Sequence, residues 1–388
     1  MAFQLNTNST APAATTLPNS RRRRLTAAAG MAAAAAAAGA MMLGVAFAGP
    51  ASASTAAPAT ASASASPASL TVGIADPDLI RETAAVQASQ LTAMKAIGIT
   101  SIRLDANWDW VEYGGQGTYD WSMLDQVVES VRAAGMSVDL IIDGCPPWAA
   151  TAGTAGDASP QPASSGKYAD FAAAVAARYA PEGVNIFEIW NEPNLQGSWQ
   201  PKPNPAAYTA ILVQASKAIR KVDPAAFIIS GGLAPAVSNG TDISPTDFLA
   251  DMYADGAKGS FNAVGYHPYS YPAMPNTYEA WSGWSQMSQT SPSIRSIMTS
   301  HGDSSIPVWI TEVGAPSSGP DGVGVTAQAN EFTQAITDAQ NTSWVGGLYL
   351  YSWQDEGTDQ TNNEDWFGLL TAAGAQKPAY TAVQNALQ

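Results

Sequence analysis

Two glutamates stand where short apolar runs end, and their type and spacing could support acid–base and nucleophilic chemistry. Glu192 closes the run at residues 186–191 and precedes Pro193, which cannot continue a β-ladder. Glu312 closes a second run of the same kind, at residues 307–311. Hydrolysis of a glycosidic bond needs two carboxyl groups, one as proton donor and one as nucleophile or base. The pair therefore predicts a glycosidase, provided that the fold brings the two strand ends together.

The elements that must position these glutamates alternate along residues 70–388, with short apolar runs followed by helical segments. We expect eight strands, at residues 70–75, 101–104, 137–142, 185–190, 227–230, 262–266, 307–311 and 347–352. Helix-ending glycines are expected at positions 98 and 135, helix starts at 204–205, 244–245 and 291–292, and a final helix from position 378. Eight such units favour an α/β fold, the closed (β/α)8 or TIM barrel. An open doubly wound sheet is disfavoured because no glycine-rich phosphate loop follows the first strand.

In a barrel of this kind the two glutamates lie on the fourth and seventh strands, across the mouth from each other. The carboxyl ends of the strands are the edge where the active sites of this fold lie. Other predicted strand ends also carry chemically capable side chains, and these are Arg103, Asp143, Cys145, His267, Tyr269 and Trp353. We therefore expect one polar site at the barrel mouth, built from several strands.

Composition limits the partners that this chain can have. Its 388 residues carry a formal net charge of −15, and without the arginines at 21–24 thirteen basic residues stand against 32 acidic ones. This excess disfavours nucleic acid and anionic polymers and suits a neutral partner. Cys145 is the only cysteine, and only two histidines are present, His267 and His301. We therefore expect no intramolecular disulfide, no metal site and no cofactor.

Residues 1–53 resemble an export signal rather than part of a fold. Four arginines at 21–24 precede a weakly apolar Ala/Gly-rich run, which is similar to a twin-arginine signal, and small residues at 51–53 suit signal cleavage. A membrane anchor is the alternative, but alanine contributes little transfer energy. Residues 54–69 contain only Ala, Ser, Pro and Thr and predict a linker before a catalytic domain at 70–388. We expect a secreted, extracellular protein without a stable membrane anchor.

The motif Trp190-Asn191-Glu192-Pro193, followed at the right separation by Trp309-Ile310-Thr311-Glu312, resembles the large clan of retaining glycosidases on (β/α)8 barrels. Within that clan the chain is most similar to glycoside hydrolase family 39 or family 5, and the resemblance covers the whole predicted barrel. It implies that Glu192 is the acid/base and Glu312 the nucleophile.

The same resemblance implies roles for neighbouring strand ends. Asn191 would bind the sugar 2-hydroxyl, and His267 and Tyr269 would form a sixth-strand pair whose tyrosine holds the nucleophile. Arg103 would lie beside the nucleophile, and Trp353 would form the floor of the subsite. Two alternatives remain open from the residues themselves: Arg103 could instead neutralise Glu188, and His267 could be an ordinary core histidine. Asp143 and Cys145 match neither family closely, and this leaves the substrate open.

Tryptophans are frequent after the predicted strand ends, where eight of the twelve occur. Indole faces stack on pyranose rings, although we expect about half of these eight to pack loops onto the barrel instead. Trp148, Trp199 and Trp353 are the candidate stacking platforms.

The sequence therefore predicts a secreted, monomeric, retaining glycosidase that acts on an oligo- or polysaccharide with neutral, β-linked sugars, and internal cleavage is favoured. An exo-acting β-glycosidase or β-xylosidase and a non-catalytic carbohydrate-binding barrel remain as alternatives. A metal-dependent polysaccharide deacetylase is disfavoured, because the two histidines are far apart in the sequence.

Overall fold

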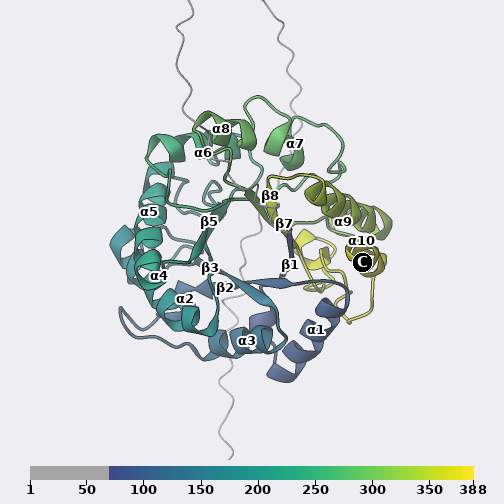
Figure 1. Cartoon of the computed structure of the whole chain (residues 1–388), viewed down its shortest axis with the longest axis horizontal. Coiled ribbons are helices and arrows are strands. Elements are labelled where there is room, and N and C mark those ends of the chain that lie inside the picture. Colours follow the sequence, from purple (N-terminus) through teal and green to yellow (C-terminus); the bar gives the residue numbers. More distant parts are fainter. Residues whose placement is uncertain (1–69) are drawn as a thin grey trace, which may run out of the picture.

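The computed structural model describes residues 70–388, so the predicted export signal at 1–53 and the linker at 54–69 lie outside the described residues. The eight strands are parallel, and their order in the sheet is β5-β4-β3-β2-β1-β8-β7-β6. Isolated parallel bridges between Ile229 and Ala263 and between Leu233 and Tyr266 join β5 to β6 and close the ring. The strands form the centre and the helices surround them (Figure 1). The predicted (β/α)8 barrel is confirmed.

Every expected strand is present within a few residues of its predicted bounds. The strands are β1 (Thr71–Ala75), β2 (Ser101–Asn107), β3 (Ser137–Asp143), β4 (Ile186–Asn191), β5 (Phe227–Gly232), β6 (Val264–Tyr266), β7 (Val308–Val313) and β8 (Val345–Leu350). The α-helices are α1 (Ala84–Ala96), α2 (Trp108–Val111), α3 (Ser122–Ala133), α4 (Ser165–Tyr179), α5 (Pro205–Val222), α6 (Pro245–Ala254), α7 (Gly283–Ser288), α8 (Ile294–Ser300), α9 (Val325–Gln340) and α10 (Pro378–Leu387). Short 3-10 turns are η2 (Leu79–Arg81), η3 (Ala180–Glu182) and η4 (Asn363–Trp366).

Local capping explains where the helices begin. The side chain of Asn204 accepts a hydrogen bond from the Ala207 amide, with proline at the first position of α5, as predicted. The expected helix start at 291–292 is wrong, because α8 begins at Ile294. There Ser293 and Ser296 form a capping box that satisfies two backbone amides, and this outweighs the proline signal two residues earlier.

The barrel interior below the mouth is filled by aromatic rings. The ring centroid of Trp309 on β7 lies 5.0 Å from that of Phe227 and 6.2 Å from that of Tyr349. Gly73 faces Tyr349 so closely that a Cβ there would lie 2.4 Å from the tyrosine ring. Gly347 faces Trp309, where a Cβ would lie 2.6 Å from the indole. Small residues on β1 and β8 thus make room for a packed floor, above which the polar site is built.

Helices cover the outside of the strands with a continuous apolar layer that contains most of the buried hydrophobic side chains. Within residues 70–388, no helix combines the length and the apolar character that crossing a membrane requires.

Candidate active site

β4 brings its polar side chains to the mouth by breaking strand alternation. In a regular strand Glu188, Trp190 and Glu192 would share one face. Here Trp190 and Glu192 have φ angles of +70° and +46°, a conformation that is rare for bulky residues. Trp190 turns into the helix layer, where its ring centroid lies 5.0 Å from that of Trp199. Asn191 and Glu192 are therefore both free to take part in the site.

β7 reaches the same result by a register shift. Its pairing with β8 is irregular between Ile310 and Val313, and both of these side chains are buried in the helix-facing layer. Two residues, Thr311 and Glu312, lie between them and both make contacts inside the barrel. The bulge thus places adjacent residues on the same side of the strand.

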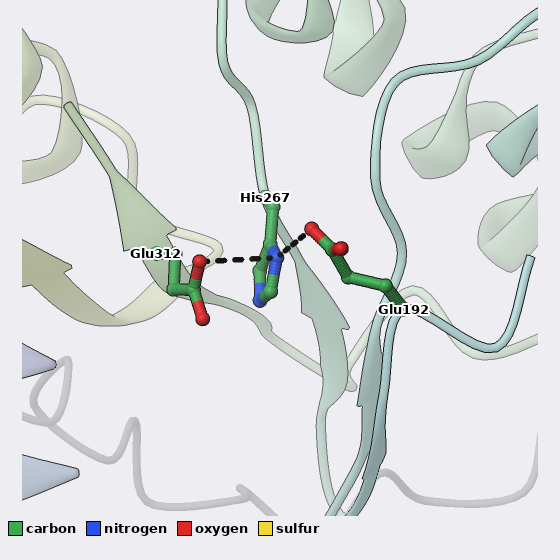
Figure 2. A group of neighbouring side chains, drawn as sticks. All are labelled: Glu192, His267 and Glu312. Atoms are coloured by element: carbon green, nitrogen blue, oxygen red, sulfur yellow. Dashed lines mark hydrogen bonds and ion pairs between the residues drawn. The ribbon is translucent and has the colours of Figure 1, made fainter. Parts of the chain in front are cut away.

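Glu192 and Glu312 face each other across the mouth with the ring of His267 between them (Figure 2). One oxygen of each carboxylate and one ring nitrogen of His267 all lie within 4.8 Å of one another. This separation fits the carboxylate pair of a retaining glycosidase, whereas an inverting pair stands farther apart to admit a water molecule. The predicted pairing of the two glutamates is present in the structure.

Glu312 is held as an anion by donors on two sides. Nη1 of Arg103 lies 2.7 Å from Oε1, and the Tyr269 hydroxyl donates to Oε2 over 2.8 Å. Burial by itself would raise the pKa of Glu312, but the charges of His267 and Arg103 and the hydrogen bond from Tyr269 hold this pKa below its ordinary value. An ionised carboxylate is the form that a nucleophile needs.

Glu192 has different neighbours. Its Oε1 lies 3.0 Å from Nδ1 of His267, and its Oε2 lies 3.5 Å from the Ser198 hydroxyl. His267 is fully buried. Burial alone would lower the pKa of His267, but Glu312 and Glu192 raise it above its ordinary value. Glu192 therefore sits beside a group with which it can share a proton.

Arg103 joins the two strands, and both of the alternatives left open by its sequence position are realised. Besides Glu312 it contacts Glu188, with Nε 2.6 Å from Oε2, and Asn191, with Nη2 3.0 Å from Oδ1. Burial opposes the charge of Arg103, but Glu188 and Glu312 raise its pKa well above the ordinary value. Because Asn191 gives its oxygen to Arg103, its Nδ2 donor is available to a ligand at the mouth.

A buried layer beneath these groups was missed by the sequence reasoning, apart from Glu188. Oε1 of Glu188 accepts hydrogen bonds from the Thr311 hydroxyl at 3.1 Å and from the Gly232 amide at 2.9 Å. Nε2 of His267 lies 3.0 Å from Oγ1 of Thr311. A Cβ on Gly232 would lie 2.1 Å from that same Nε2, so only glycine leaves room for the ring. The one available signal was the Gly231-Gly232 pair at the end of the fifth strand.

The third strand contributes residues without a nucleophilic role. Burial, and then the charge of Asp105, raise the pKa of Asp143 well above its ordinary value, and the Asn107 amide lies 3.2 Å from one of its oxygens. Cys145 is 4% exposed, and burial raises the pKa of its thiol. A buried thiol with a raised pKa is not an activated nucleophile. Deeper on β3, Asp139 is fully buried with both carboxyl oxygens unpartnered, and burial raises its pKa well above the ordinary value.

Two of the predicted stacking platforms are wrong. Trp199 is fully buried, with its indole N–H donating to Gln161. Trp353 is 1% exposed in the helix-facing layer, its ring centroid 5.9 Å from that of Tyr380 on α10. Trp148 is half-buried, but its N–H donates to the Glu112 carbonyl and Lys167 covers one face of its ring. The prediction for Trp353 came from the family resemblance and an expected strand at 347–352, whereas β8 ends at Leu350, three residues before Trp353.

Tyr351 takes the place at the mouth that was expected for Trp353. Its ring packs 5.2 Å from Phe367, which also contacts Tyr269 at 6.0 Å. Its hydroxyl lies 3.0 Å from Oε2 of Glu364 on η4. Burial raises the pKa of Glu364 to about 7, and the nearby carboxylates, Glu312 among them, add to this shift. Neither Tyr351 nor Glu364 was identified from the sequence.

Of the eight tryptophans that follow predicted strand ends, four are buried and four are at least partly exposed, as expected. The buried ones are Trp108, Trp199, Trp284 and Trp353, and the others are Trp110, Trp148, Trp281 and Trp366.

The group of Glu192, His267 and Glu312 also has the spacing of a metal site. Its donor atoms are already committed to one another, however, since Nδ1 of His267 lies 3.0 Å from Glu192 and 3.7 Å from Glu312. A cation would also have to share the pocket with the guanidinium of Arg103, 2.7 Å from Glu312. We therefore assign these residues to hydrogen bonding and acid–base chemistry.

A closed barrel with two facing glutamates at the carboxyl ends of its fourth and seventh strands defines the class of a (β/α)8-barrel glycoside hydrolase. The chain belongs to the cellulase family, glycosyl hydrolase family 5, whose sequence model matches residues 75–356. The predicted resemblance to families 5 and 39 is confirmed, the first by the sequence model and the second by the likeness of fold.

Individual relatives agree with this assignment. A β-xylosidase from Geobacillus stearothermophilus is 32% identical over 143 residues, which is 34% of this chain but only 27% of that relative. A family 39 glycoside hydrolase from Bacteroides cellulosilyticus WH2 superposes with a TM-score of 0.65 at 22% identity, covering 82% of this chain and 64% of that one. The GH5_18 enzyme from Streptomyces cattleya gives a TM-score of 0.61 at 19% identity, covering 83% and 80%. The structural likenesses support the fold.

Proposed function

We propose that this chain cleaves β-linked neutral glycosides by double displacement, with Glu312 as nucleophile and Glu192 as acid/base. The observation that carries the proposal is the contrast within one close pair. Glu312 is bound by Arg103 and Tyr269, which stabilise its anion, whereas Glu192 is bound by His267, with which it can share a proton. Opposite surroundings of this kind separate the two roles of a carboxyl pair.

In the first step an oxygen of Glu312 bonds to the anomeric carbon while the bond to the leaving oxygen breaks. Glu192 gives its proton to that leaving oxygen. In the second step a water oxygen bonds to the same carbon, the bond to Glu312 breaks, and Glu192 takes the proton from the water. Two inversions return the sugar to its original configuration. The free Nδ2 of Asn191, fixed by Arg103, is placed to donate to a sugar hydroxyl beside the pair.

For the substrate we propose a short, neutral glycan cut from its end. The net charge of −15 and the carboxylates Glu312 and Glu364 around the mouth disfavour an anionic sugar. Internal cleavage was expected from three tryptophan platforms, two of which are buried. Among the similar proteins, one is named a β-xylosidase and another an exo-β-1,4-mannosidase. Internal cleavage remains the second candidate, supported by the cellulase description of the family.

The deciding experiment follows the anomer released first, by NMR before mutarotation, from aryl β-xyloside, β-glucoside and β-mannoside. We expect retention. Glu312→Gln should abolish turnover. Glu192→Gln should lose activity on poor leaving groups, retain it on dinitrophenyl glycosides, and regain part of it with azide. An inverted product would overturn the double displacement, and full activity in both variants would remove the two glutamates from the mechanism. No hydrolysis of any glycoside by the wild type would favour a carbohydrate-binding barrel instead.

Cutting mode is tested on an oligosaccharide series in the same assay. Terminal cleavage releases one sugar at a time without an early fall in polymer length, and internal cleavage shortens the polymer first. EDTA should leave the rate unchanged, whereas a rate restored only by added metal would contradict the assignment of the three-residue group to hydrogen bonding.

We also propose that the chain is exported, because four arginines precede the weakly apolar run in residues 1–53. Replacing Arg21, Arg22, Arg23 and Arg24 by lysine should block secretion. Undiminished secretion from a host without the twin-arginine translocase would contradict this route.

A further inference from the structure

A chain of hydrogen bonds beneath the mouth has a fixed direction. Glu188 is paired with Arg103, with Nε 2.6 Å from Oε2, so its carboxylate acts only as an acceptor. The Thr311 hydroxyl must therefore donate its single proton to Oε1 of Glu188, 3.1 Å away. In its other contact, 3.0 Å from Nε2 of His267, Oγ1 of Thr311 can only accept. Nε2 of His267 consequently carries a hydrogen.

The other nitrogen of His267 then determines the protonation of the acid/base. Nδ1 lies 3.0 Å from Oε1 of Glu192, and a hydrogen bond there needs one proton. Either a protonated Glu192 donates to Nδ1, or a doubly protonated His267 donates to the carboxylate. A neutral ring with its only hydrogen on Nδ1 could satisfy the contact without the extra proton. The bond from Nε2 to Thr311 disfavours that tautomer.

We propose that Thr311 is a positioning residue, which fixes the tautomer of His267 and thereby makes His267 and Glu192 hold one proton between them. The inference rests on the proposed function and deepens it, since it identifies what keeps Glu192 loaded with the proton that the leaving group takes. When that proton departs with the leaving oxygen, His267 and Glu192 no longer share one, and the attacking water then supplies a new proton to them.

The charged groups around His267 favour the state in which His267 and Glu192 hold the shared proton in the free enzyme. Glu312 faces the ring from β7, with Oε2 3.7 Å from Nδ1, and Glu192 faces it from β4. Arg103, from β2, opposes the proton, and the neutral Tyr269 lies with its ring centroid 6.2 Å away. The balance raises the pKa of His267 despite burial. Once Glu312 forms an ester its charge is gone, and the pair binds the proton less strongly, just when Glu192 must act as base.

The tautomer can be observed directly, because the chain has only two histidines. Two-bond ¹H–¹⁵N NMR of protein labelled at histidine distinguishes an Nε2–H ring, an Nδ1–H ring and an imidazolium. His301→Gln removes the second histidine, whose ring stacks on Tyr253. We expect hydrogen on Nε2 of His267 at every pH at which the protein is folded. A neutral Nδ1–H ring in the wild type would overturn the proposal.

Threonine variants test the catalytic consequence. Thr311→Val keeps the shape and removes the hydroxyl, so His267 can move its hydrogen to Nδ1 and the pair loses its extra proton. The basic limb of the kcat/KM profile should then move down by about one pH unit, and the rate on a poor leaving group should fall about tenfold at neutral pH. A dinitrophenyl glycoside, whose leaving group needs no proton, should be cleaved nearly as fast as before. Thr311→Ser should restore the wild-type profile.

A matched control is Thr209→Val on α5, a buried threonine whose hydroxyl has no hydrogen-bond partner. It should leave the pH profile and the leaving-group dependence unchanged. An equal loss on both substrates in Thr311→Val, without a shift of the basic limb, would reduce Thr311 to a packing residue. If the wild type cleaves no glycoside, the proposed function fails, while the NMR spectrum still decides the tautomer.

Discussion

The two halves of the barrel mouth hold the same side chain in opposite ways. In the nucleophile half, Glu312 on β7 meets the guanidinium of Arg103 from β2 and the phenol of Tyr269 from the segment after β6, and both favour its anion. In the acid/base half, Glu192 at the end of β4 meets the imidazole of His267, also from the segment after β6, and this ring can exchange a proton with the carboxylate. Because both residues are glutamates, the proposed roles of acid and nucleophile rest on their different neighbours.

The largest expected effect comes from breaking the nucleophile half at Arg103. Arg103→Met leaves Glu188 and Glu312 without their cation, and removing one partner of a buried pair costs about 3–5 kcal/mol. We expect that loss in urea unfolding, and at least about a hundredfold lower kcat/KM because the anion of Glu312 is no longer stabilised. Arg178→Met is the control, since its ion pair with Asp125 is exposed and should be worth less than about 1 kcal/mol. Equal costs at both sites would contradict the role of Arg103.

The acid/base half can be broken without touching a charged group. In Gly232→Ala the new methyl would lie 2.1 Å from Nε2 of His267, so the ring must shift, and its hydrogen bond to Glu192 should be lost or weakened. Losing a positioned general acid costs about a hundredfold or more on poor leaving groups. Substrates with activated leaving groups should be cleaved nearly as fast as by the wild type. Initial rates on a series of aryl glycosides will test this. Gly156→Ala, where no atom lies within 4 Å of the added Cβ, should change neither. A uniform loss on every substrate would point to general misfolding.

A smaller effect is expected from removing one donor to the nucleophile. Tyr269→Phe deletes the hydrogen bond to Oε2 of Glu312, so the depressed pKa of that carboxyl should rise, by about one unit. Activity needs the anion, so the acid limb should move to higher pH. The pairing of Glu312 also adds stability above its unfolded pKa, which is lost as pH falls through the folded pKa, and this contribution should shrink. Tyr266→Phe loses only a bond to the Gly283 carbonyl and should leave the acid limb in place.

The smallest effects are expected from two aromatic residues of the same segment, Tyr351 at the mouth and Trp353 in the helix-facing layer. Tyr351→Phe releases Glu364 at the mouth and should raise KM several-fold with little loss of stability, about 1 kcal/mol. Trp353→Phe should do the reverse, with an unchanged KM and a packing loss of about 1–3 kcal/mol, because its ring lies against Tyr380. Steady-state kinetics and urea unfolding on the two variants check this. A rise in KM for Trp353→Phe would return that residue to the sugar-binding surface.

The sequence by itself determined the elements and the pair of glutamates that the proposed mechanism uses. Apolar runs of strand length and capping residues such as Asn204 are local signals, so all eight strands were predicted within a few residues. Glu192 and Glu312 were found because their positions on the fourth and seventh strands follow from counting βα units. These features depend on neighbouring residues and on the regular repeat of the barrel.

Only the tertiary structure decided which way the side chains at the strand ends face. Period-two alternation predicts that Trp190 points inward and Asn191 outward, and the positive φ at Trp190 reverses this. The family resemblance placed Trp353 at the mouth, where Tyr351 lies instead. Bulges and turns of this kind are set by contacts between strands far apart in the sequence, such as the link from Thr311 to Glu188. Local propensity depends only on residues near in the sequence, so it cannot predict contacts between distant strands. The proton that we propose His267 and Glu192 share depends on these contacts.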